Sequence, residues 1–245
     1  MEILDKDLAF LAKCRNEELR VLCDILTYDR NGMLRYAEQL TGSDAYLLHY
    51  PMEMSQMAGE IADELCKFGS NTVVTYFRKG VPDCYETVVQ RVCRQMKVQT
   101  ESGEDVASME RKLLQKVCED AVEQMSEEQI RELADEMGIK EKDLMPQFVI
   151  TVLMRLMSRN PKLWARVIRG VIRVVLLDFG GRRVAMKGLE RVLGVAAGPL
   201  GTLVMTLWTI WDIASPAYRV CIPAVLQVGL MRMDKTPRLW GRRAA

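Results

Sequence analysis

Apolar residues recur along the chain mainly at the spacing of an α-helix, with turn signals between the segments. Residues 5–13 predict a short helix, and Asn16 is a candidate N-cap for the next one. Further apolar stripes lie within residues 55–68, 83–96 and 109–121. Strict alternation of apolar and polar residues is rare. The pattern therefore predicts an all-α protein, a bundle of about ten or more helices.

The pattern changes after residue 144, where the chain becomes more apolar and more basic. Pro161 suits the first turn of a helix that carries three arginines along one side. Gly180-Gly181 interrupts it, and a second group of cations precedes two apolar segments, residues 192–211 and 220–231. The cations of the two groups are Arg166, Arg169, Arg173, Arg182, Arg183, Lys187 and Arg191. We interpret residues 192–231 as an apolar helical hairpin.

The hairpin could meet lipid or fill a protein core. Twenty residues without a charge reach about 30 Å as a helix, enough for a bilayer core. Pro199, three glycines and three threonines oppose insertion, and the twelve-residue segment 220–231 is too short to span. We therefore predict a buried hairpin or one that inserts only on a trigger. Residues predicted to pack or close the hairpin are Gly194, Gly198, Gly201, Tyr218, Arg219 and Pro223, and Trp208 and Trp211 suit an interface.

The charge of the chain is unevenly distributed. The net charge is +1, yet residues 1–150 hold 18 Lys and Arg against 29 Asp and Glu, whereas residues 151–245 hold 16 against 4. We predict an acidic helical module over residues 1–150 and a basic, apolar one over residues 151–245. The two halves could pair with each other, or the basic half could face anionic lipid. Nucleic acid is disfavoured, because the arginine-bearing helix lacks polar base-reading residues.

No constellation of residues predicts catalysis, a metal or a cofactor. The single histidine, His49, precedes a Tyr-Pro turn and has no partner at a ligating or catalytic spacing. Asp178-Phe179-Gly180 spells a kinase motif without the other kinase motifs. Most of the seven scattered cysteines lie among apolar residues at helical spacing, which indicates reduced, buried thiols and a reducing cytoplasm. The N-terminus shows no signal peptide.

Several stretches together resemble the bacterial YaaW family. Residues 7–11 and 17–19 are similar to the small N-terminal domain of that family, which would cover residues 1–50. The segment 217–227, AYRVCIPAVLQ, is close to the C-terminal signature of the family, with Cys221 where Thr is expected, and residues 64–69 and 80–82 fit between them. The resemblance implies no reaction. Part of the family is distantly similar to ubiquinol–cytochrome c assembly chaperones, which are helical and non-enzymatic.

These observations predict a cytoplasmic, non-enzymatic protein that is peripheral at the inner membrane. Its basic, apolar residues 161–231 would contact an anionic membrane surface or a membrane protein. The alternative is a soluble helical adaptor or assembly chaperone whose hairpin is buried core. The sequence leaves open a separate protein partner and a homo-oligomer.

Overall fold

A computed structural model describes residues 5–29, 32–69, 84–123 and 217–235. Within these ranges the regular elements are six α-helices and two short 3-10 helices, joined by turns and one isolated bridge between Tyr28 and Leu34. The all-helical prediction is therefore confirmed for the described residues. The prediction of ten or more helices is not confirmed, because the described residues contain six α-helices.

The first half of the chain supplies five of these α-helices. Their bounds are α1 Asn16–Thr27, α2 Asp44–His49, α3 Ala58–Gly69, α5 Tyr85–Gln95 and α6 Val106–Glu123, and the 3-10 helices are η1 Ala9–Lys13 and η2 Met54–Met57. α1, α3, α5 and α6 each bury the apolar stripe that their sequences predict, because only one face of each is apolar. Lys97, at φ 57°, follows the end of α5.

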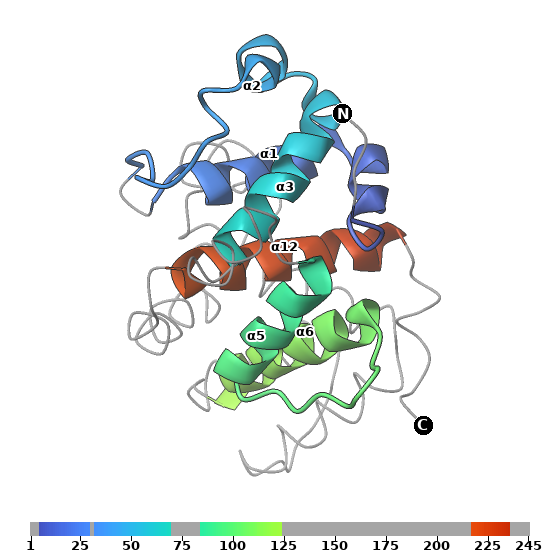
Figure 1. Cartoon of the computed structure of the whole chain (residues 1–245). Coiled ribbons are helices and arrows are strands. Elements are labelled where there is room, and N and C mark those ends of the chain that lie inside the picture. Colours follow the sequence, from blue (N-terminus) through green and yellow to red (C-terminus); the bar gives the residue numbers. More distant parts are fainter. Residues whose placement is uncertain (1–4, 30–31, 70–83, 124–216, 236–245) are drawn as a thin grey trace, which may run out of the picture.

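The last helix, α12 (Tyr218–Lys235), lies at the centre of the described structure. It contacts α1, α3, α5 and α6, so that it runs between the N-terminal helices and the α5–α6 pair (Figure 1). Every residue from Val220 to Met231 is buried. Twelve consecutive buried residues cover more than three helical turns, so neighbours must surround α12 on all sides.

Close approach and paired polar groups allow this burial. A Cβ at Gly229 would lie 3.2 Å from Leu114 Cδ1 and 3.3 Å from Glu110 Cβ, so glycine lets α12 and α6 approach closely. The buried Gln227 donates from Nε2 to the carbonyl oxygen of Glu18 at 3.0 Å. Pro223 sits in the second turn, where its missing N–H would have faced the carbonyl of Arg219 near the exposed helix start.

The structure refines the predicted elements. α1 begins at Asn16 with Arg15 as its N-cap, so Asn16 is not the cap. The Asn16 side chain instead links α1 to η2. It donates to the carbonyl oxygen of Pro51 and accepts from the N–H of Met54, each at 2.8 Å. The sequence analysis did not predict α2.

The predicted hairpin is described only in part. Its second segment, residues 220–231, belongs to the same core as the helices of the first half. Its first segment, residues 192–211, lies outside the described residues, as does the predicted module boundary near residue 150, and both stay predictions. No helix in the described part of the chain combines the length and apolarity that crossing a membrane requires.

Candidate functional site

A buried ion pair joins α6 to α12. Arg232 donates from Nε to Glu110 Oε2 at 2.6 Å and from Nη2 to Glu110 Oε1 at 3.2 Å. Tyr85 donates from its hydroxyl to Glu110 Oε1 at 2.8 Å. Arg232 Nη2 also donates to the carbonyl oxygen of Asp7 at 2.6 Å, and its guanidinium carbon lies 4.3 Å from the ring centre of Phe10. One arginine thus connects the N-terminal segment, α6 and α12.

Burial sets the electrostatics of this cluster. The Glu110 side chain is wholly buried and that of Arg232 is 14% exposed. Burial raises the pKa of Glu110, while Arg232 and the Tyr85 hydroxyl oppose that rise. Burial alone would lower the pKa of Arg232, but the adjacent Glu110 carboxylate raises it overall. The polar groups of Glu110, Arg232 and Tyr85 are hydrogen-bonded to one another, which fixes the packing of three elements.

A second polar cluster supports α2. Tyr50 donates from its hydroxyl to Asp24 Oδ1 at 3.0 Å, and the rings of Tyr46 and Tyr50 stack with centres 4.4 Å apart. The hydroxyls of Tyr28 and Tyr46 are 3.2 Å apart. Burial raises the pKa of Asp24 to about 6, with the Tyr50 hydrogen bond and Arg20 opposing it. Burial, followed by the charge of Asp24, raises the pKa of Tyr50 to about 12.

Six of the seven cysteines are buried, and Cys84 is exposed. Burial raises the pKa of the Cys14 thiol to about 11, and it raises the pKa of four further thiols to about 12, those of Cys23, Cys66, Cys93 and Cys221. Such thiols stay protonated and are poor nucleophiles. Within residues 5–29, 32–69, 84–123 and 217–235, no cluster of three or more His, Cys, Asp or Glu side chains could hold a metal ion.

Two further polar side chains, His49 and Glu64, have partners within the protein. His49 Nδ1 lies 2.9 Å from Glu53 Oε2 on the surface of α2. Glu64, on the acidic side of α3, is buried and accepts the N–H of Gln39 at 2.8 Å. It therefore ties the segment before α2 to α3.

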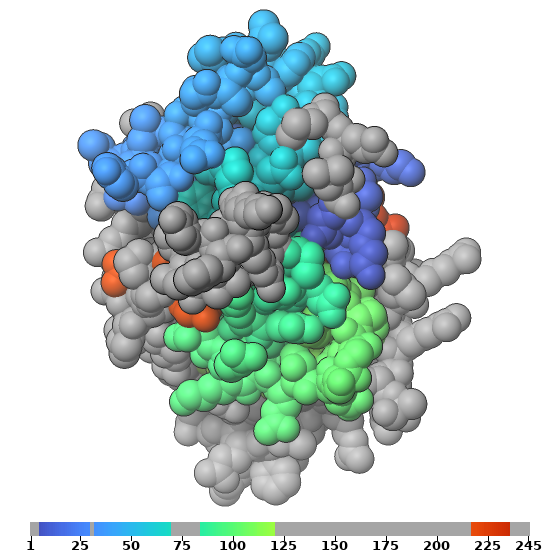
Figure 2. Space-filling model, viewed as in Figure 1, coloured from blue at the N-terminus to red at the C-terminus, as the bar shows by residue number. Residues whose placement is uncertain are grey.

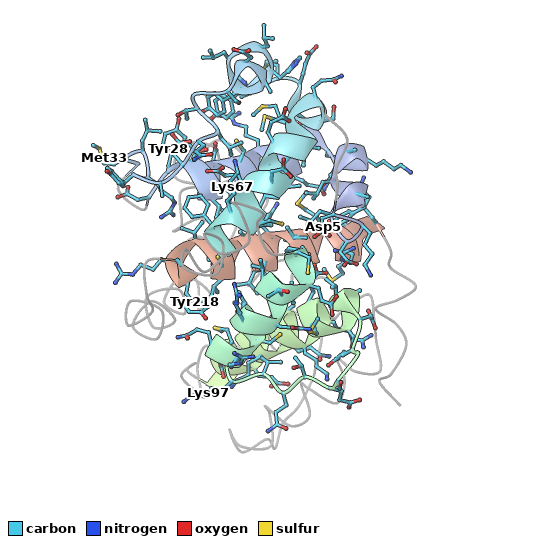
Figure 3. The ribbon with its side chains drawn as sticks, in the orientation of Figure 1. Asp5, Tyr28, Met33, Lys67, Lys97 and Tyr218 are labelled. Carbon is cyan, nitrogen blue, oxygen red and sulfur yellow. The ribbon has the colours of Figure 1, made fainter. Side chains whose placement is uncertain are left out.

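A group of exposed apolar side chains lies between α1 and α3. Leu47, Leu48 and Met52 are 73%, 75% and 79% exposed. We call these three residues the α2 face. Met33, Leu34 and Tyr36, in the preceding loop, are also exposed, and Met33 lies at the outer edge of the molecule, away from α12 (Figure 3).

The predicted contact residues are described only at the start of α12. Tyr218 is partly buried at that end (Figure 3). Arg219 is exposed and Pro223 is buried. The other predicted residues lie outside the part of the chain that the structure describes. They are Arg166, Arg169, Arg173, Arg182, Arg183, Lys187, Arg191, Gly194, Gly198, Gly201, Trp208 and Trp211.

The sequence analysis missed both polar clusters and the α2 face. Glu110 could have been recognised as a carboxylate on the apolar side of a predicted helix, one residue after Met109 and three before Leu113. Arg232 stands between two methionines at the end of an apolar segment. Asp24 follows Cys23 within a buried stripe. Charged residues inside apolar stripes were the available signal, although they do not reveal which of them pair.

Glu110→Gln tests the ion pair. The substitution keeps the shape and an acceptor for Tyr85 but leaves the cation of Arg232 partly buried without its counter-charge. We expect the free energy of unfolding to fall by roughly 3–5 kcal/mol in urea titrations. Lys116→Ala, which breaks the pair with Asp120 on the same helix, should cost about 0.5 kcal/mol. Equal effects of the two substitutions would contradict the assigned role of Glu110.

Asp24→Asn tests the buried carboxyl. The pKa of Asp24 in the folded protein, about 6, lies above its ordinary value of 3.8, so the folded state binds this proton more tightly than the unfolded state. The contribution of Asp24 to stability is therefore largest at low pH and is lost as the pH rises from about 4 to about 6. Relative to the parent, the variant should gain up to about 1.4 kcal/mol per pH unit in that window. Urea unfolding across it measures this; a constant difference between the two proteins would refute the buried-charge account.

Comparison with known proteins places the chain in a family. Residues 3–36 match a domain of unknown function, DUF3944. The chain is 32% identical over 233 residues to a UPF0174 protein of Helicobacter pylori strain J99, covering 94% of this chain and 91% of the relative. It is 24% identical over 230 residues to the UPF0174 protein YaaW of Escherichia coli K12, covering 93% and 94%. No solved structure matches the chain significantly. With this identity and coverage, the chain belongs to the UPF0174 family, which includes YaaW.

Proposed function

We propose that this protein is a non-enzymatic, peripheral membrane-associating protein of the cytoplasm. Its contact with an anionic membrane surface, or with a membrane protein, would be made by residues 161–211. This range is narrower than the predicted one, because residues 220–231 are occupied in the core.

The distribution of charge supports the proposal. The described residues hold 21 Asp and Glu and 15 Lys and Arg. Residues 151–216 hold 3 Asp and Glu and 10 Lys and Arg among mainly apolar residues. An acidic body is repelled by anionic headgroups, whereas a basic and apolar segment is attracted to them and can bury side chains between them.

The placement of α12 is the observation that carries the proposal. α6 ends at Glu123 and α12 begins at Tyr218, and both helices belong to one core. The stretch of chain that contains the basic, apolar segment therefore leaves and re-enters the same acidic body. Such a connection would keep the body at the membrane once the segment binds there.

The same placement favours a second candidate function, a soluble helical adaptor. α12 is the second segment of the predicted hairpin, and it is core rather than exposed surface. If residues 192–211 were core as well, the protein would act through its surface alone, without lipid.

Flotation with lipid vesicles distinguishes the two functions. The full chain should float with vesicles that contain phosphatidylserine at low ionic strength and should be released at high ionic strength. Arg166→Gln, Arg169→Gln and Arg173→Gln together should weaken binding by roughly tenfold to a hundredfold, because each cation contributes about 1 kcal/mol near such a surface.

The control variant removes three positive charges from the helical body that the described residues form. Lys6, Lys13 and Arg94 are exposed cations there. Changing all three to Gln should leave binding within about twofold of the parent if the body does not touch the headgroups. Absence of the parent from both phosphatidylserine and neutral vesicles would overturn the proposal in favour of the soluble adaptor.

A further inference from the structure

We propose that the α2 face (Leu47, Leu48 and Met52) is a docking surface for a basic amphipathic helix of a partner protein. This inference is separate from membrane association, since it concerns the acidic half of the chain and none of residues 161–211.

The exposure of the α2 face is concentrated rather than scattered. Three of the six large hydrophobic side chains that are exposed in the described residues, Leu47, Leu48 and Met52, fall within six residues in and directly after α2. The residues between α1 and α3 form the upper end of the visible surface (Figure 2). Single exposed apolar side chains are ordinary on protein surfaces, but neighbouring ones at one place mark a contact surface.

The chain segment around the α2 face carries mainly negative charge, and the guanidinium of Arg20 in α1 lies 6.0 Å from the centre of the Tyr50 ring. Residues 32–60 carry four carboxylates, Glu38, Asp44, Glu53 and Glu60, against one arginine, Arg35. Arg35 is directed inward, since its Nε donates to the carbonyl oxygen of Ile25 at 3.0 Å. A face with apolar side chains and an acidic surround is complementary to a segment with apolar and cationic side chains. The same carboxylates would be repelled by an anionic bilayer.

The support beneath the α2 face is already ordered. The stacked rings of Tyr46 and Tyr50 lie within and directly after α2, and Ser43 Oγ accepts the N–H of Tyr46 at 3.1 Å. The side chain of Asn16 anchors the backbone on both sides of Met52, through Pro51 and Met54. A surface held in one conformation loses little conformational entropy on binding, which favours docking of a partner.

The six-residue α2 presents two adjacent leucines, and Met52 follows in the turn after it. A contact of this size suits about two turns of a partner helix, whose apolar residues recur on one side at i, i+3, i+4 and i+7. Cationic side chains flanking that stripe would face Asp44 and Glu53. We therefore assign the face to a basic helix of another protein rather than to lipid.

Fluorescence anisotropy with two labelled peptides tests this assignment on the full chain. The first probe is a designed amphipathic helix with leucine on one side and lysine on the other, and the second has glutamate in place of every lysine. The lysine peptide should bind, and Leu47→Ser, Leu48→Ser and Met52→Ser together should weaken it by at least about tenfold. Far-UV circular dichroism and urea unfolding check that this variant keeps its fold, as expected for exposed positions.

The charge contribution has a matched control. Asp44→Asn with Glu53→Gln should weaken binding of the lysine peptide by roughly threefold to tenfold at low salt, whereas Glu17→Gln with Glu101→Gln, exposed carboxylates on other elements, should leave it unchanged. Undiminished binding to the folded triple serine variant would overturn the proposal. So would a concentration-dependent dimer of the parent that the triple variant abolishes, because the face would then belong to a second copy of this chain. Neither result changes the outcome expected for the flotation experiment with lipid vesicles, so the two proposals are tested separately.

Discussion

The burial of α12 on every side is the constraint on which the described structure depends. Its twelve buried residues extend about 18 Å and need neighbours all round. α1, α3, α5 and α6 provide such neighbours, although they come from the first half of the sequence. The polar groups that enter this core are paired, Gln227 with the backbone of α1 and Arg232 with Glu110. A buried charge without its partner is costly. The ion pair therefore favours a single axial register of α12 against α6.

The chain combines two segments of opposite charge. α6 ends before the basic, apolar residues and α12 begins after them, and both helices belong to one core. The α2 face, which combines exposed apolar side chains with carboxylates, belongs to the acidic body itself. Under the proposals above, the basic segment would meet an anionic surface and the α2 face would meet a basic helix. The protein would then connect a membrane to a protein partner without performing a reaction.

Periodicity was enough to predict the helices whose stripes face one core, such as the Leu19, Leu22 and Leu26 stripe of α1. It could not predict the fate of residues 220–231, because a helix that is apolar all round suits a membrane, an interface and a core equally. α2 was missed since its apolar residues point outward and give no amphipathic stripe. The pairing of Arg232 with Glu110, 122 residues away, follows from tertiary packing that no local pattern encodes. The family was predicted correctly from residues 7–19 and 217–227, but it brings no assigned role.

Native-state amide hydrogen exchange of the full chain tests the central claim most directly. If α12 is the core helix, the amides of residues 224–231 should be among the slowest to exchange, with the same protection as those of residues 22–26 in α1. Both should then exchange only through global unfolding. Exchange of the α12 amides through an opening of much lower free energy, while α1 and α6 remain protected, would contradict the account. It would show that the helix docks on a core that is already complete without it.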